Sequence, residues 1–328
     1  MTSSASLFLT VVITARHDNY GGDFRERVAA PLRFNDERLS ERGVPYEVIL
    51  VEWDPIPGRT LLCEMLAQAL PGVAGRVLKP IVVAREYQAA LTQNPRAGYL
   101  EYVAKNVGIR RAGAPFVLVT NADILLGREV VDAIAARRVQ PGILYRAPRY
   151  DIKLGVDQSG LRWEALEDPS NHVRRSVLEP PFFASGAGDF LLADRDTFHG
   201  LRGFNEVYRA ARAGIDLNFM AKAVGASVPI ADTGGPVYHL NHLGSMRISK
   251  TLHPDHSDSP WGDLGWHSSR VVYNNRDAWG LAEAPPRRAS DGTLFLDFDW
   301  RAVPPLVELR RVVLPARGPH TLTATTMS

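Results

Sequence analysis

The sequence predicts an α/β protein built on a mostly parallel sheet with helices on both faces. Short apolar runs rich in β-branched residues alternate with longer helical stretches through the first half of the chain. This alternation is typical of a parallel sheet, because a connection between parallel strands is long enough to hold a helix. Ligands of such sheets bind beyond the carboxyl ends of the strands, so polar residues at those ends are the first candidates for a site.

The first half predicts four strands and at least three helices. Strands are expected over residues 7–14, 46–54, 77–84 and 116–121, and helices over 24–42, 61–70 and 99–112, with a further helix following residues 124–126. An interruption is expected at Pro31, because proline lacks the N–H that a helix interior uses. Pro71 and Gly72 are expected to close the second helix.

The second half predicts shorter elements. Strands are expected over 143–152, 227–232 and 236–240, a helix over 214–224, and a Gly-rich turn followed by a short strand over 182–198. Residues 155–178 are polar and are expected to be irregular. After about residue 244 turn formers, His and Trp gather, although 294–300 and 306–314 are strand-like.

Composition excludes several classes of protein. The 328 residues are 45% hydrophobic and 23% charged, which is an ordinary globular balance. A net charge of +2 without basic stripes excludes a nucleic-acid-binding surface. A lone cysteine, Cys63, forms no internal disulfide and favours the cytoplasm. We expect no transmembrane segment, because no run reaches about 18 apolar residues, and the β-branched start SLFLTVVITAR is better explained as a strand than as a signal peptide.

The most informative stretch is FVLVTNADILL, residues 116–126, where a buried strand ends in Asn121-Ala122-Asp123. Burying an unpaired carboxylate is costly, so Asp123 should face a group that stabilises it. A hard divalent cation, Mn²⁺ or Mg²⁺, is one such partner. The alternative is an Asx turn that ends the strand. Two other strand exits are also polar, at Arg16 to Asp18 and at Glu52 to Asp54.

The order of these features resembles the GT-A glycosyltransferases, especially the bacterial family-2-like members. The resemblance covers residues 7–245 and is carried by TARHD, VEWD, KNVGIRRAGAPFVLVTNAD, SGAGDFLLADRDTFHGLRGFNE, GIDLNFMAKAVGA and PVYHLNH. No single motif is specific, and the order and spacing carry the likeness. It implies a GT-A-like, Rossmann-like catalytic domain over 1–245, with a nucleotide-binding half over 1–127 and an acceptor half over 128–245. Residues 246–328 would form a C-terminal extension of loops and strands on the same domain.

The resemblance implies a metal-dependent transfer of sugar from a nucleotide-diphospho-sugar, with a UDP-sugar favoured, to a hydroxyl acceptor. Asp123 and His239 would bind the metal, with His242 open as a replacement for His239. Asn121 stands where the family has its first Asp, and we expect Asn121→Asp to keep or raise activity. The residues expected to contact the donor are Thr14, Ala15, Arg16, Asp18, Glu52, Asp54, Lys105, Asn106, Asn121 and Ala122.

The same resemblance places the acceptor site and the catalytic base in the second half. Asp216 is the expected base if the enzyme inverts configuration, although Ile215 breaks the family's Glu-Asp pair and a helix-dipole role is open. Asp189, which follows two glycines, and Trp266 are expected at the acceptor, which would be a soluble metabolite. A sugar nucleotidyltransferase and a non-catalytic nucleotide- or sugar-binding relative are the alternatives. The donor sugar, the stereochemistry and the oligomeric state, a homodimer included, stay open.

Overall fold

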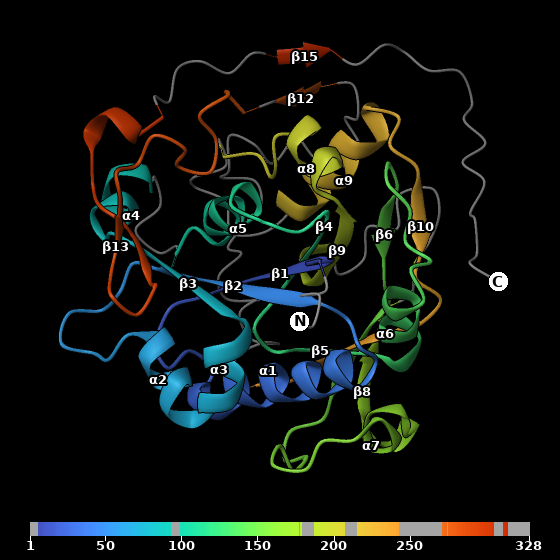
Figure 1. Cartoon of the computed structure of the whole chain (residues 1–328). Coiled ribbons are helices and arrows are strands. Elements are labelled where there is room, and N and C mark those ends of the chain that lie inside the picture. Colours follow the sequence, from blue (N-terminus) through green and yellow to red (C-terminus); the bar gives the residue numbers. More distant parts are fainter. Residues whose placement is uncertain are drawn as a thin grey trace.

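A nine-stranded sheet forms the centre of the fold, in the order β10-β6-β9-β4-β1-β2-β3-β14-β13 (Figure 1). The computed structural model describes residues 6–92, 99–176, 178, 187–206, 215–242, 271–273, 275–304 and 311–313. Strand β1 (Leu9–Ala15) pairs in parallel with β2 (Tyr46–Trp53) and β4 (Phe116–Thr120), and β2 pairs in parallel with β3 (Leu78–Val83). Strand β9 (Phe190–Asp194) runs antiparallel between β4 and β6 (Leu144–Arg146). The predicted mostly parallel α/β sheet is confirmed.

Helices cover both faces of this sheet (Figure 1). Helices α1 (Phe24–Glu41), α2 (Leu62–Ala69) and α3 (Pro71–Val77) lie on one face, and α5 (Glu101–Arg110), α8 (Arg195–Gly200) and α9 (Ile215–Gly225) lie on the other. The alternation of side chains along β1 explains this layering, because Val11 and Ile13 belong to one buried cluster while Val12 belongs to the other.

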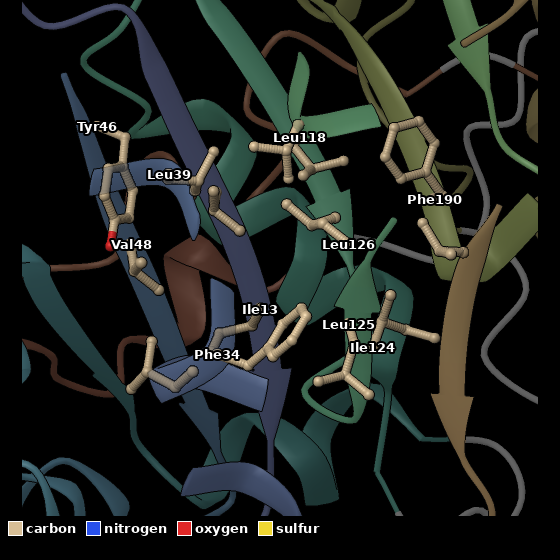
Figure 2. Packing of buried hydrophobic residues seen from close by; sticks show 14 of the residues in the cluster. Ile13, Phe34, Leu39, Tyr46, Val48, Leu118, Ile124, Leu125, Leu126 and Phe190 are labelled. Atoms are coloured by element: carbon tan, nitrogen blue, oxygen red, sulfur yellow. The ribbon is translucent and has the colours of Figure 1, made fainter. Parts of the chain in front are cut away.

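Figure 2 shows the first of these clusters, between the sheet and α1. Phe34 and Leu39 of α1 lie against the strand residues Ile13, Val48 and Leu118. All five are at most 6% exposed. Truncating such a side chain to Ala costs about 2–5 kcal/mol, so this layer holds the strand ends that carry the site in a fixed place.

A second, four-stranded sheet has the order β5-β11-β7-β8. Its strands are β5 (Ile124–Leu126), β11 (Val237–Leu240), β7 (Arg149–Ile152) and β8 (His172–Arg175). Only residues 121–123 separate β4 of the large sheet from β5 of the small one. Asn121, Ala122 and Asp123 therefore lie where the two sheets meet.

Two expectations about the secondary structure are wrong, and a proline lies at each of the two places. Helix α1 continues through Pro31, which is buried, so the predicted interruption is absent and packing offsets the lost hydrogen bond. The single strand expected over 143–152 is two strands in different sheets, β6 and β7, divided at Ala147 and Pro148. Proline cannot donate to a sheet ladder, which is consistent with a break at this position.

The remaining described elements complete the fold. Strand β14 (Leu294–Leu296) pairs in parallel with β3, and β13 (Pro286–Arg288) pairs with β14. The other elements are α4 (Glu86–Leu91), α6 (Arg128–Ala135), α7 (Trp163–Glu167), β10 (Ile230–Asp232), β12 (Val271–Tyr273), β15 (Arg311–Val313) and 3-10 turns at Pro169–Asn171, Ala187–Asp189 and Trp300–Ala302. The sequence did not predict α3, α4, α7, α8, β5, β8, β12 or β13. Within the described residues, every helix is too short or too polar to cross a membrane.

Candidate functional site

An open cleft with a volume of about 340 Å³ lies at the carboxyl ends of β1 and β4. This is the edge of the sheet at which the sequence predicts a ligand. Eight of the predicted site residues line it, namely Thr14, Ala15, Arg16, Asp18, Asn121, Ala122, Asp123 and His239. The cleft is also lined by Tyr20, Phe24, Arg27, Val28, Tyr99, Glu101, Arg149 and His242.

Asp123, His239 and His242 converge at the inner end of this cleft. The carboxylate oxygen Oδ2 of Asp123 lies 3.5 Å from Nε2 of His239 and 3.8 Å from Nε2 of His242. Among the described residues, one ligand atom from each of the three lies within 4.8 Å of the others. Atoms that share one cation at about 2.1 Å lie roughly 3–4 Å apart, so these residues fit a metal ion. The sequence expected one of the two histidines here, and the structure brings both.

The pairing of the small sheet explains how the three residues meet. His239 of β11 stands opposite Ile124 of β5, the residue that follows Asp123. The backbone N–H of Leu240 donates to the carbonyl of Asp123 at 3.0 Å, which fixes the turn. His242 follows the strand and packs on Tyr20 with ring centroids 5.0 Å apart. Gly21 has φ of +75°, and a Cβ there would lie 2.5 Å from Nδ1 of His242, so only glycine allows this approach.

The charges at the convergence point are strongly coupled. Burial raises the pKa of the Asp123 carboxyl, but His239, His242 and Arg27 together lower it well below its usual range. Burial lowers the pKa of the His239 imidazole, but Asp123 and Asp151 outweigh this and raise it to about 9. Without a metal the carboxylate therefore faces a charged imidazole, and a cation that binds here displaces a proton.

His239 is oriented from behind by a second carboxylate. Asp151 of β7 is its register partner across the small sheet, and Oδ1 of Asp151 lies 3.0 Å from Nδ1 of His239. A proton on Nδ1 donates to Asp151, so in the neutral imidazole the lone pair of Nε2 is directed toward Asp123 and is available to a cation. A carboxylate behind the ring is the usual support of a metal-binding histidine.

Asn121 makes its contacts with protein groups. Its Nδ2 donates to Oδ1 of Asp189 at 2.7 Å, and its Oδ1 accepts from Nζ of Lys105 at 2.7 Å. The second oxygen of Asp189 accepts from Nη1 of Arg149 at 2.6 Å. Lysine only donates and a carboxylate only accepts, so these partners fix the orientation of the amide. The expected tolerance of Asn121→Asp conflicts with this contact, because an aspartate would face a second carboxylate.

The two helical residues expected at the nucleotide lie elsewhere. Lys105 is fully buried, and its Nζ donates to Glu101, Asn121 and the carbonyl of Gly188 at 2.6–2.8 Å. Asn106 is also fully buried, and its amide bonds both backbone groups of Phe204. Both residues are outside the lining of the cleft as far as the chain is described. Their polar side chains suggested a role in binding the nucleotide. In the structure, their hydrogen bonds instead connect α5 to Asn121, Gly188 and Phe204.

Glu52 and Asp54, at the end of β2, have different surroundings. Oε2 of Glu52 accepts the N–H of Leu62 at the start of α2 at 2.6 Å, and burial raises the pKa of this carboxyl to about 7. Among the described residues Glu52 lies outside the cleft lining. Asp54 is also outside that lining, but its carboxylate binds Nη2 of Arg16, which lines the cleft, at 2.9 Å.

Among the described residues, Asp189 and Asp216, which were expected on the acceptor side, lie outside the cleft lining. Oδ2 of Asp216, in the first turn of α9, accepts the N–H of Gly188 at 3.0 Å, and burial raises the pKa of its carboxyl. Both oxygens of Asp189 already accept hydrogen bonds, from Asn121 and Arg149. Trp266 lies outside the described residues.

Sequence reasoning missed Arg27, Arg149 and Asp151. Arg27 is 4% exposed and places Nη1 3.7 Å from Oδ2 of Asp123. It lies between Phe24 and Val28 on the buried face of α1, and an arginine at a core-facing helical position is a signal that could have found it. Arg149 and Asp151 are two residues apart and so share one face of β7, which no local pattern connects to His239.

Comparison with known proteins gives a distant likeness to solved structures. No protein-family model and no curated protein matches the chain. Similar structures include S. aureus TarS 1-349 in complex with UDP-GlcNAc, at 13% identity and a TM-score of 0.42 over 73% of this chain. The catalytic domain of Drosophila β1,4-galactosyltransferase 7 in complex with xylobiose is 12% identical, with a TM-score of 0.40 over 91% of this chain. The matches span 61% of that TarS chain and 98% of the galactosyltransferase domain. At these values the likeness decides nothing about activity.

Proposed function

We propose that the protein is a metal-dependent glycosyltransferase that moves a sugar from a nucleotide-diphospho-sugar, with a UDP-sugar favoured, to a hydroxyl acceptor. The observation that supports this most directly is the convergence of Asp123, His239 and His242 in a polar cleft at the carboxyl ends of β1 and β4. Nucleotides bind at this edge of α/β sheets. The order of the sequence motifs, which resembles GT-A glycosyltransferases, selects sugar transfer among the reactions that such a cleft could support.

The donor set favours Mn²⁺ over Mg²⁺. Two imidazoles and one carboxylate face the same point, whereas Mg²⁺ prefers a shell of oxygen ligands. When bound, the metal would neutralise negative charge on the diphosphate as the bond to the sugar breaks. Asp123, His239 and His242 would hold it, and Asp151 would keep the lone pair of His239 Nε2 directed toward it.

Two arginines in the cleft lining suit the diphosphate itself. The side chain of Arg16 is one-quarter exposed and is held by Asp54. Arg27 lies beside Asp123 in the same cleft lining. Guanidinium groups donate paired hydrogen bonds to phosphate oxygens, so both residues would stabilise the charge that develops on the leaving group. Arg149 lines the same cleft, but its three nitrogens already contact protein groups.

Asp216 is the residue we assign to the acceptor hydroxyl. Burial raises the pKa of its carboxyl, and the N–H of Gly188 holds one of its oxygens. A carboxylate with a raised pKa accepts a proton more readily, which suits a general base. In an inverting reaction Asp216 would take the proton as the acceptor oxygen forms its bond to the sugar.

A panel of nucleotide sugars with and without Mn²⁺ tests this function. The proposal expects Mn²⁺-dependent release of a nucleoside diphosphate from a UDP-, GDP- or dTDP-sugar, first by hydrolysis and then faster with an acceptor. Release of pyrophosphate from a nucleoside triphosphate and a sugar phosphate would instead identify a nucleotidyltransferase. Calorimetry that detects binding without turnover would identify a non-catalytic relative. If no nucleotide binds in the presence of Mn²⁺, the cleft is not a nucleotide site.

A further inference from the structure

A partly buried chain of hydrogen bonds connects the candidate base to the candidate metal site. It runs from Asp216 through the N–H and the carbonyl of Gly188 to Lys105, at 3.0 and 2.8 Å. From Lys105 it continues to Oδ1 of Asn121 at 2.7 Å. Nδ2 of the same amide donates the next hydrogen bond, to Oδ1 of Asp189 at 2.7 Å. Asn121 is therefore the link between the two halves of the site.

Arg149 completes this chain on the metal side. Its Nη1 donates to Asp189 at 2.6 Å, its Nε donates to Asp151 at 2.6 Å, and its Nη2 lies 3.0 Å from Nδ1 of His239. The guanidinium group is planar, so its two carboxylate partners fix both its position and its rotation, and Nη2 packs against the ring of His239. Any displacement of Asp189 is consequently transmitted to the ring of His239.

The neutral amide of Asn121 is the chemistry that this position requires. It must accept from Lys105 and donate to Asp189, which an amide can do and an ionised carboxylate cannot. An aspartate would place two carboxylates in contact in a region where Asp189 is 4% exposed. Like charges at this distance are unfavourable in a buried site, so Asp189 and Arg149 would shift.

We propose that Asn121 is a positioning residue that acts on the metal ligand His239 through Asp189 and Arg149. Its role is to hold the imidazole in the orientation that binds the cation, and its side chain is not itself a ligand of donor or metal. This inference rests on the metal site of the proposed function, but it does not depend on which substrate is used.

A charge exchange between Asn121 and Asp189 tests the proposal. Asn121→Asp should weaken Mn²⁺ binding by about 10- to 100-fold, the usual effect of losing support behind a metal ligand. The double variant Asn121→Asp/Asp189→Asn should recover most of that affinity. In it, the carboxylate at position 121 accepts from Lys105 and from the amide at position 189, while the carbonyl of that amide accepts from Arg149. The hydrogen bonds and the total charge are thereby restored.

Affinity is measured by Mn²⁺ calorimetry without nucleotide, so the result is independent of sugar transfer. Nitrogen NMR of the His239 ring in the metal-free protein gives a second readout, because a change in its partners changes the tautomer signal. Gln140→Glu, at an exposed position, controls for one added negative charge. Wild-type affinity in Asn121→Asp overturns the proposal, and so does a folded double variant that stays as weak as the single one.

Arg149→Lys keeps the test decisive if Asn121→Asp fails to fold. Lysine preserves the charge but cannot bridge Asp151 and Asp189 as a planar fork, so Mn²⁺ affinity should fall and the His239 signal should change. Unchanged affinity and an unchanged signal would refute the link. Mn²⁺ binding that responds to these variants in a protein without sugar transfer would support the inference and reject the proposed function. A wild-type protein that binds no Mn²⁺ would overturn both.

Discussion

Oδ2 of Asp123 lies 3.5 Å from Nε2 of His239, although Asp123 follows a strand of the large sheet and His239 lies on an inner strand of the small one. The contact exists because β5 continues directly from the turn after β4 and pairs with β11. Opposite charges therefore meet at this junction of the two sheets, and most of the testable consequences arise from it.

Asp123→Ala should abolish Mn²⁺-dependent nucleotide binding. The substitution removes the only carboxylate of the three converging side chains, and we expect affinity to fall by more than about 100-fold, beyond the effect of losing a supporting residue. Calorimetry with UDP and Mn²⁺ measures this, with circular dichroism as a check of the fold. The exposed Asp157→Ala is the matched control. Full activity in a folded Asp123→Ala protein would show that the metal site is assigned wrongly.

His239→Ala and His242→Ala should both weaken Mn²⁺ binding, and His239→Ala should weaken it more. Both imidazoles reach the Asp123 carboxylate, but Nε2 of His239 lies closer, at 3.5 Å against 3.8 Å for His242, and Asp151 supports the ring of His239. Mn²⁺ titrations of each variant without nucleotide compare the two losses. His199→Ala, on the exposed side of α8, provides the control. Normal binding by His242→Ala would remove that residue from the ligand set.

Mn²⁺ affinity should rise with pH. Asp123 and Asp151 outweigh the effect of burial and raise the pKa of His239 to about 9 in the metal-free protein, and only the neutral imidazole binds a cation. Below that pKa each binding event releases the proton of His239, so affinity should increase about tenfold per pH unit and level off above it. Calorimetry at pH 7 in buffers of different ionisation enthalpy counts the released proton. Affinity that is flat from pH 6 to 9 would contradict this prediction.

Asp216→Asn should reduce sugar transfer by at least about 100-fold while nucleotide affinity stays nearly unchanged. The amide oxygen still accepts the N–H of Gly188, but it cannot take a proton from an acceptor. Transfer rates and UDP calorimetry separate the two effects. Asp196→Asn, in the first turn of α8, controls for a carboxylate that only stabilises a helix start. Transfer at the native rate would return Asp216 to that structural role.

The stability of the Glu52→Gln variant relative to that of the wild type should increase as the pH rises. Burial raises the folded-state pKa of Glu52 to about 7, above the value of 4.5 for an unperturbed Glu, so its contribution to stability is complete below about pH 4.5 and is lost as pH rises through 7. Glutamine stays neutral at every pH, so the variant does not lose this contribution to stability. Urea unfolding at pH 5, 7 and 9 should show the free energy of unfolding of the variant gaining on that of the wild type. The exposed Glu26→Gln should show no such trend.

The sequence alone determined the layered α/β fold and the place of the cleft. Both follow from local patterns, because β-branched runs and helical periodicity specify elements and a parallel sheet collects its strand ends at one edge. This is why Arg16, Asn121 and Asp123 could be placed at the cleft before any contact was known. The elements that were missed are short ones, such as β5, in which a few residues carry too little pattern to predict a strand.

Only the tertiary structure decided the partners of those strand ends. The pairing of β11 between β5 and β7 brings Asp151 and Arg149 to His239, and no local pattern encodes which distant strands pair or in which register. Lys105 is likewise buried by the fold, and its Nζ donates a hydrogen bond to Asn121. The neutral amide of Asn121 looked like a departure from a family motif when seen in the sequence. Its reason is the carboxylate of Asp189, which lies far away along the chain and becomes a neighbour only when the sheet forms.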